Sequence, residues 1–366
     1  MAKQTESGKM KKFKSTILSA LALIVFTESL RAEFLYVANI GSFDISAYHI
    51  GKNGSLIPVP GSPFPAGNRP SSVAVDPLGR FAYVTDFGVD SDNISAYRIA
   101  KNGSLTPIPG SPFSAGGAPR AVVADFRFVY VANEGSNSIS VFRISENGSL
   151  TPVPGSPFPT GLSPISMALD FLGRFLYVVN VDSLNVSAYR IGENGSLIPV
   201  PGSPFPTGDG SVSVAVDSLR RFLYVANTTV NISHIIDNIS AYRIGANGSL
   251  TPIAGSTTPT GSGPITAVVD LLGQFVFVTN QESNDVSAYQ IGKSGFLTTV
   301  PGSPFPVEGT TPVGAVVEPS HRLLYVTNET SDSITAYQIG KNGSLTVIPG
   351  SPFPSGIAPF SLTISH

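Results

Sequence analysis

The sequence of 366 residues contains no cysteine and no tryptophan, and only 13% of its residues are charged. Without cysteine there is no disulfide framework, no thiolate metal site and no cysteine nucleophile. The 22 Lys and Arg against 24 Asp and Glu give a net charge of -2, so the basic excess of nucleic-acid-binding proteins is absent. The four histidines form no pair at a metal-ligand spacing. We therefore expect no nucleic-acid partner, no metal and no cofactor.

Turn-forming residues are abundant instead, with 37 glycines and 31 prolines beside 42% hydrophobic residues. A tetrapeptide of the form Tyr-Val-x-Asn occurs seven times, at successive spacings of 47, 47, 47, 47, 53 and 48 residues. Self-similarity at such a period is typical of repeat architectures. The copies lie at residues 36–39, 83–86, 130–133, 177–180, 224–227, 277–280 and 325–328.

Each repeat unit contains four short β-type segments, as in residues 72–113: SVAVD, FAYVTD, NISAYRI and LTPIPGSPF. β-Branched and aromatic runs bounded by Gly, Pro, Asn and Asp predict strands. Asn-Gly pairs such as Asn53–Gly54 join the third and fourth segments, and we expect type I′ hairpins there, with positive φ at both residues. The prolines of the fourth segment predict an edge strand.

Four antiparallel strands per unit at a period near 47 predict an all-β fold, a seven-bladed β-propeller. The first copy begins at Phe34 and lacks its SVAVD-type segment, whereas residues 360–365 (FSLTIS) are such a segment without partners. We therefore expect the C-terminal strand to join the first blade and close the ring. Residues 33–366 would form this single domain, which we expect to be a monomer.

Residues 1–32 are different in character. Lys9, Lys11, Lys12 and Lys14 precede an apolar run at residues 16–26, which is shorter than the ~20 residues of a membrane-spanning helix. This order is typical of a signal peptide, with cleavage near Ala32, and predicts export to the periplasm, the cell surface or the medium. Two alternatives remain: an uncleaved membrane tether, which would be the chain's only membrane contact, and a degraded repeat segment.

The repeated YVTN-type strand, the SVAVDPLGRFAYV run at residues 72–84 and the sevenfold count resemble the lactonase-type seven-bladed propellers. That family includes the cycloisomerase-type 6-phosphogluconolactonases and related YVTN-repeat proteins, some of them exported. The resemblance covers residues 34–366. It implies His, Arg and Glu near Pro-His or Pro-Arg-His sequences, which bind substrate and activate water. This chain keeps Pro119–Arg120, but Ala121 follows where the resemblance implies His.

The channel mouth is where we expect ligands, on the face that carries the connections into each innermost strand. Arg69 and Arg120 lie in these connections and are predicted to bind a ligand, by neutralising an anion or an oxyanion. Asp209 is the third predicted ligand-binding residue. The catalytic candidates are Arg120, Glu308 as a general base, and His234, which lies in a loop insertion of the fifth blade.

Each of these residues also has an alternative role that involves no ligand. The arginines and carboxylates would otherwise be solvated loop residues, and His234 would be part of an exposed insertion. The Asn that ends each Tyr-Val-x-Asn copy is expected to be structural, because its side chain can cap the following turn. Asp76, Asp170, Asp217 and Asp270 are expected to start the turns between first and second strands.

Two functions from different classes follow. The first is a binding or scaffold module whose partner at the channel mouth is a protein, a glycan or another envelope component, indicated by near-identical blades and the missing histidines. The alternative is hydrolysis of a small lactone with a diverged site, as the resemblance implies. The sequence alone favours the first and leaves open whether the protein is an enzyme.

Overall fold

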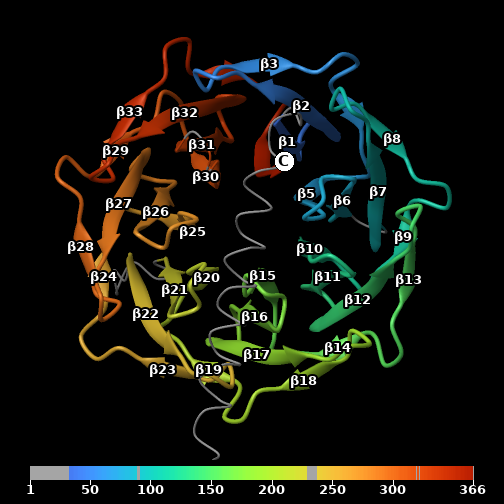
Figure 1. Ribbon diagram of the computed structural model, residues 1–366, viewed down its shortest axis with the longest axis horizontal. Coiled ribbons are helices and arrows are strands. Elements are labelled where there is room, and N and C mark those ends of the chain that lie inside the picture. Colours follow the sequence, from blue (N-terminus) through green and yellow to red (C-terminus); the bar gives the residue numbers. More distant parts are fainter. Residues whose placement is uncertain (1–32, 89–90, 229–236, 319, 321, 366) are drawn as a thin grey trace, which may run out of the picture.

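The computed structural model describes residues 33–88, 91–228, 237–318, 320 and 322–365. These residues form seven antiparallel sheets arranged as blades around a central axis, which we call the channel axis (Figure 1). The predicted all-β, seven-bladed propeller is confirmed. In the described part of the chain, no helix has the length and apolar character that crossing a membrane requires.

The first strand of each blade lines the channel and the second packs outside it. The first strands are β35 (Pro359–Ser365), β5 (Pro70–Val75), β10 (Pro119–Ala124), β15 (Pro164–Leu169), β20 (Ser211–Val216), β25 (Pro264–Val269) and β30 (Pro312–Glu318) for blades 1 to 7. The second strands are β1 (Phe34–Asn39), β6 (Phe81–Asp86), β11 (Phe128–Asn133), β16 (Phe175–Asn180), β21 (Phe222–Asn227), β26 (Phe275–Asn280) and β31 (Leu323–Asn328).

The third strand is the longest outer strand, and the fourth is split into two short pieces that both pair with it. The third strands are β2 (Asp44–Ile50), β7 (Asn93–Ile99), β12 (Ser138–Ile144), β17 (Asn185–Ile191), β22 (Asn238–Ile244), β27 (Asp285–Ile291) and β32 (Ser333–Ile339). The first pieces of the fourth strand, which pair with the C-terminal end of the third strand, are β3 (Leu56–Pro58), β8 (Leu105–Pro107), β13 (Leu150–Pro152), β18 (Leu197–Pro199), β23 (Leu250–Pro252), β28 (Leu297–Thr299) and β33 (Leu345–Val347). The second pieces, which pair with its N-terminal end, are β4 (Phe64–Pro65), β9 (Phe113–Ser114), β14 (Phe158–Pro159), β19 (Phe205–Pro206), β24 (Thr258–Pro259), β29 (Phe305–Pro306) and β34 (Phe353–Pro354).

Ring closure follows the expected route. In blade 1 the strand order is β3-β2-β1-β35, so the last strand of the chain lies against the first. Phe34 pairs with Ser365 and Tyr36 with Thr363. Because the blade combines both ends of the described chain, no blade is left without its innermost strand.

The hairpin between third and fourth strands differs from the expected type I′ turn. Only the glycine has positive φ, 81° at Gly54, and the bond from Gly51 N to Ser55 O closes a three-residue loop. Asn53 accepts hydrogen bonds from Ser55 N and Oγ through its side chain, at 3.2 and 2.7 Å. The prediction of type I′ was wrong because this side-chain cap holds Asn53 at negative φ, and the left-handed glycine completes the loop.

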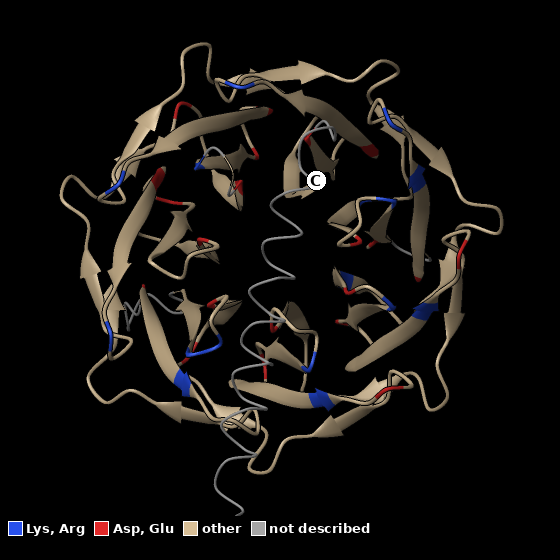
Figure 2. Cartoon of the chain, viewed as in Figure 1, with Lys and Arg blue, Asp and Glu red and all other residues tan. Residues whose placement is uncertain are grey.

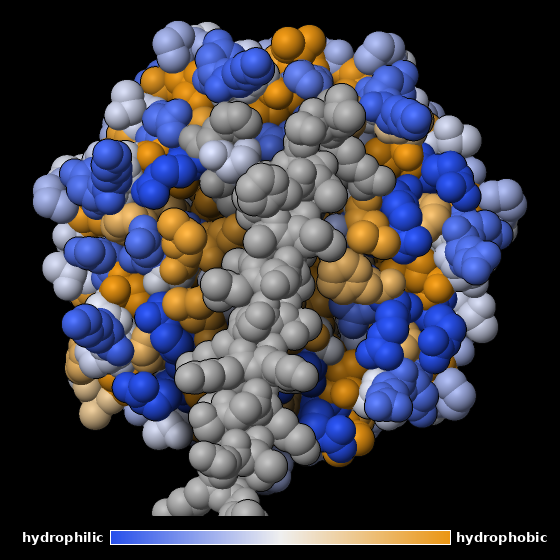
Figure 3. Space-filling model, viewed as in Figure 1, coloured by the Kyte–Doolittle hydropathy of each residue, from blue (hydrophilic) through white to orange (hydrophobic). Residues whose placement is uncertain are grey.

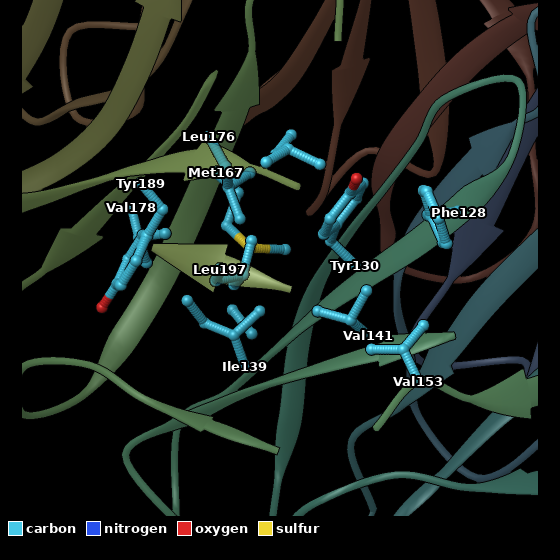
Figure 4. Packing of buried hydrophobic residues seen from close by; sticks show 12 residues of the cluster. Phe128, Tyr130, Ile139, Val141, Val153, Met167, Leu176, Val178, Tyr189 and Leu197 are labelled. Atoms are coloured by element: carbon cyan, nitrogen blue, oxygen red, sulfur yellow. The ribbon is translucent and has the colours of Figure 1, made fainter. Parts of the chain in front are cut away.

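The core lies between neighbouring blades rather than within one. Figure 4 shows the cluster between blades 3 and 4, where Phe128 and Tyr130 of β11 and Val141 of β12 pack with Met167 of β15 and Leu176 of β16. All six residues of β11 are buried, as in every second strand. Both faces of this strand are therefore covered by apolar neighbours, which explains its continuous aromatic and β-branched sequence.

Tyrosine hydroxyls link the blades through the carbonyls of hairpin glycines. Tyr325 OH donates to Gly54 O at 2.9 Å across the seam between blades 7 and 1. In blade 3, Tyr130 donates to Asp125 instead, and blade 6 has Phe277 in this position. The same inter-blade bond is made by Tyr36 to Gly103, Tyr83 to Gly148, Tyr177 to Gly248 and Tyr224 to Gly295.

The repeated polar residues have the structural roles that the sequence predicts. Asp76 Oδ1 accepts hydrogen bonds from Arg80 N and Phe81 N at 2.6 and 2.8 Å, which holds the turn after the first strand. Asn39 is fully buried, and its Nδ2 donates to Ser46 Oγ at 2.9 Å. These side chains stabilise the turns through hydrogen bonds within their own blades.

Alternating strand directions give the ring two faces. The turn face carries the connections between first and second strands, such as 76–80, and those between third and fourth strands, such as 100–104. The mouth face carries the connections between second and third strands, such as 134–137, and those into each first strand, such as 66–69.

Candidate active site

The site is built from two connections on the mouth face, in the neighbouring blades 2 and 3. Arg69 directly precedes β5 and has a positive φ of 54°. Arg120 is the second residue of β10, after Pro119. The two arginines therefore flank equivalent prolines of neighbouring blades, Pro70 and Pro119.

A β-bulge directs Arg120 out of the regular ladder. Pro119 pairs with Asn133 and Ala121 with Ala132, so Arg120 has no partner on β11. Bulges bend a strand and reorient a side chain, and they are frequent beside active sites. Every first strand has this irregularity, but only blade 3 carries a charge in it. The corresponding residues are Ser71, Ile165, Val212, Ile265, Val313 and Phe360.

Two aromatic rings and a carboxylate surround the Arg120 guanidinium. Its Cζ lies 4.8 Å from the ring centroid of Phe87 in blade 2 and 5.0 Å from that of Phe360 in blade 1. Its Nε lies 3.9 Å from Glu134 Oε2, and the two side chains are 28% and 32% exposed. Cation–π contacts of this kind hold a guanidinium in one orientation while its remaining donors stay available.

Burial and neighbouring charges both act on this guanidinium. Burial lowers the pKa of Arg120 most, and the nearby cation Arg69 lowers it further, whereas the anions Glu134 and Glu329 raise it. Arg69 contacts the same aromatic ring as Arg120, with its Cζ 5.9 Å from the Phe87 centroid. An arginine stays protonated at physiological pH, so two cations converge at this side of the mouth.

The sequence analysis missed Phe87, Glu134, Glu329 and Phe360. The first three follow directly after the Asp or Asn that ends a second strand. This position varies from blade to blade while its neighbours repeat, and that variation was a usable signal. The residues in this position are Ile40, Phe87, Glu134, Val181, Thr228, Gln281 and Glu329.

The other predicted site residues lie elsewhere. Asp209 and Glu308 are exposed in the connections that precede β20 and β30, and Glu308 donates its backbone N–H to Thr335 Oγ1 at 3.1 Å. No ion pair of either carboxylate with Arg69 or Arg120 occurs within the described residues. His234 lies outside the described residues. Across the described ranges, no three His, Asp or Glu side chains come close enough to hold a metal ion.

Chemically, this arrangement combines anion stabilisation with proton acceptance. Guanidinium groups that are already oriented stabilise an oxyanion as it forms. A carboxylate beside them can accept a proton from a water molecule. The Phe87 and Phe360 rings lie against the guanidinium, whose side chain is 28% exposed.

Comparison with known proteins gives a family and a fold. The family model described as "Lactonase, 7-bladed beta-propeller" matches residues 121–208 and 198–313, which is more than half of the chain. Among curated proteins, none matches the sequence. The family match covers blades 3 to 6 and includes Glu134, but it begins one residue after Arg120.

Solved structures with the same fold have low sequence identity to this chain. A Bacteroides uniformis protein assigned to the 6-phosphogluconolactonases has a TM-score of 0.78 at 17% identity, covering 91% of this chain and 99% of that one. A Bacteroides fragilis protein with the same assignment has a TM-score of 0.77 at 19% identity, covering 93% and 99%. The periplasmic gluconolactonase of Pseudomonas aeruginosa has a TM-score of 0.74 at 20% identity, covering 91% and 99%. The fold and the family match agree, and the chain belongs to the lactonase family of seven-bladed β-propellers.

Proposed function

We propose that this protein is an exported lactonase that hydrolyses a neutral sugar lactone at the channel mouth between blades 2 and 3. The observation that carries the proposal is the single charged bulge residue, Arg120, held between Phe87 and Phe360 with Glu134 at 3.9 Å. Family membership supports lactone hydrolysis over the binding or scaffold role that the near-identical blades suggested. The mouth also has the asymmetry that a catalytic site needs.

The proposed reaction uses one water molecule. Arg120 and Arg69 bind the lactone carbonyl oxygen, and Glu134 accepts a proton from the attacking water. The water oxygen bonds to the carbonyl carbon, and negative charge develops on the carbonyl oxygen facing the guanidinium groups. The bond from that carbon to the ring oxygen then breaks, the ring oxygen takes up a proton as a hydroxyl, and the product is a hydroxy acid.

The charge of the mouth face favours a neutral substrate. Arg69 and Arg120 are its only cations within the described residues, against twelve Asp and Glu. A phosphorylated lactone would approach against this net negative field, which lowers its rate of association. The acids of this face are Asp44, Asp86, Asp92, Glu134, Asp182, Asp209, Asp237, Glu282, Asp285, Glu308, Glu329 and Asp332.

Export is part of the proposal. It is supported by the basic cluster and apolar run within residues 1–32, which lie outside the described residues. The fold shared with a periplasmic gluconolactonase is consistent with it.

A pH-stat assay of plain and 6-phosphorylated sugar lactones tests the function, with the spontaneous rate subtracted. We expect turnover of the plain lactone, with kcat/KM at least about tenfold above that of the phosphorylated one. Arg120→Ala should lower kcat/KM about a hundredfold or more. Arg127→Ala is the matched control, because Arg127 also lies against a Phe ring, at 5.1 Å, but on the turn face. No turnover of any lactone, or an equal loss in both variants, contradicts the proposal.

A further inference from the structure

The turn face exposes a row of large apolar side chains close to the channel. They occupy the turns between first and second strands in five consecutive blades, and Leu219 is 60% and Phe126 57% exposed. Figure 3 shows this face, on which orange side chains lie among blue ones and the blue side chains are most frequent around the rim. We call these residues the apolar row: Leu78, Phe126, Phe171, Leu172, Leu219, Leu271 and Leu272.

Cations surround the apolar row. Of the sixteen Lys and Arg in the described residues, fourteen lie on the turn face or at strand ends next to it. Figure 2 shows their distribution around the ring as blue segments. They are Lys52, Arg80, Arg98, Lys101, Arg127, Arg143, Arg174, Arg190, Arg220, Arg221, Arg243, Lys293, Arg322 and Lys341.

The acids of the turn face are mostly withdrawn from its surface. Asp76, Asp125, Asp170, Asp217, Asp270 and Glu318 are buried. Asp76 and Asp217, for example, accept backbone hydrogen bonds within their own turns. Among the described residues, only Glu33, Glu146 and Glu193 are partly or fully exposed there. Asp76, Asp170 and Asp217 also form ion pairs with Arg80, Arg174, Arg220 and Arg221. With fourteen cations against these nine acids, an approaching surface still meets apolar side chains and a net positive charge.

The opposite face does not combine these features. It exposes four large apolar side chains, Phe43, Leu162, Leu184 and Ile357. Its charges are those of twelve acids and two arginines. Both faces therefore expose apolar side chains, but only the turn face combines them with an excess of positive charge among the described residues.

The described chain also begins on the turn face. Glu33 accepts a hydrogen bond from Ile50 N through its backbone oxygen at 2.9 Å, and from Ser320 Oγ through its carboxylate at 2.8 Å. Residues 1–32, which contain the Lys cluster and the apolar run, are joined to the propeller at this point. Any tether formed by them would hold this same face toward a membrane.

We propose that the turn face docks the propeller on an anionic lipid surface. Apolar side chains that enter the headgroup region, flanked by Lys and Arg that attract anionic lipids, are the combination by which peripheral proteins bind membranes. The proposal concerns the face opposite the candidate active site and does not depend on which reaction that site performs.

The absence of tryptophan allows a direct test. In the chain of residues 33–366, which holds all the described strands, Leu219→Trp places a single Trp in the apolar row. Ile357→Trp places one on the mouth face, at a nearly equal exposure of 58%. With vesicles of phosphatidylglycerol and phosphatidylcholine, we expect a blue shift of Trp emission for Leu219→Trp and none for Ile357→Trp. No shift in the first variant, or equal shifts in both, would overturn the proposal.

Sedimentation with vesicles measures the contribution of the row itself. For the triple variant Phe171→Ser, Leu219→Ser and Leu271→Ser, the partition coefficient into anionic vesicles should be at least about tenfold lower than for the parent. The control Leu162→Ser, Leu184→Ser and Ile357→Ser removes three exposed apolar residues of the mouth face and should bind as before. Circular dichroism verifies that both variants are folded. Equal binding by both, or equal binding to vesicles of phosphatidylcholine alone, contradicts the proposal.

Discussion

The guanidinium of Arg120 lies 5.0 Å from the ring centroid of Phe360, although the two residues belong to blades 3 and 1. Blade 2 lies between these blades in the ring, so the two side chains meet over the first strand of blade 2. Phe360 is also the bulge residue of the closing strand β35. Ring closure and the candidate site therefore share one residue.

Replacing Phe360 should impair catalysis more than stability. Phe360→Ala removes one of the two rings that orient Arg120, and a cation–π contact contributes about 0.5–2 kcal/mol. We expect kcat/KM for the plain lactone to fall by about threefold to thirtyfold, with the melting temperature lowered only slightly, because Phe360 is half-buried at the mouth. Ile357→Ala, three residues earlier and exposed, is the control. An unchanged kcat/KM in Phe360→Ala would show that the ring does not position Arg120.

Asp86 should make stability depend on pH. It stands where six blades have Asn, and burial is the main cause that raises its pKa to about 6, while a hydrogen bond from Ser95 lowers it. A folded-state pKa above the unfolded value means that the folded protein binds more protons, so this contribution is present at acidic pH and is lost as pH rises from about 4 to about 6. Two pKa units correspond to about 3 kcal/mol at most.

The matched variant is Asp86→Asn, which restores the residue of the other blades. Its amide can donate to Ser95 as Asn39 donates to Ser46. We expect it to be more stable than the parent above pH 6, with the difference shrinking toward pH 4. Melting curves at pH 4, 5, 6 and 7 measure this. A difference that is constant over this range would contradict the assigned titration.

Two substitutions at the inter-blade tyrosine position should change the stability of the ring in opposite directions. Tyr325→Phe leaves the Gly54 carbonyl without its donor and should destabilise the ring by about 1–2 kcal/mol. Phe277→Tyr adds a hydroxyl in the one blade that has Phe, facing the hairpin of Gly343, and should stabilise by about 0.5–1 kcal/mol. Calorimetry measures both. A loss of stability in Phe277→Tyr would show that the hydroxyl finds no acceptor there.

Removal of residues 360–366 tests the closure. This deletion takes away the partner of β1 and exposes the buried side chains of blade 1, Leu35 and Val37 among them. We expect the melting temperature to fall by more than about 10 °C, since losses of several kcal/mol shift the midpoint by that order. Deletion of residues 1–32, in which no described strand lies, is the control and should leave the midpoint unchanged. Equal midpoints for the two deletions would contradict the assigned closure.

The fold could be predicted almost completely from the sequence, because each repeat contains the same four strand segments. The last segment of the chain also supplies the strand that the first repeat lacks. The hairpin type was wrong, since the Asn side chain caps its own loop. At the site, Arg69 and Arg120 were found by their place before or after a proline. Glu134 and Phe87 occupy a position whose residue varies between blades, which marks the position in the sequence. Which of these side chains meet depends on the bulge and on the spacing of blades, and neither is visible in a single repeat.

The separation of charge between the two faces has a consequence for how the molecule approaches other bodies. Acids on one side and cations on the other give the propeller an electric dipole along its channel axis. Such a dipole is oriented by the field of an anionic surface before contact is made. The propeller would then arrive with its basic side forward and its candidate active site directed away from the surface, open to substrate from the solvent.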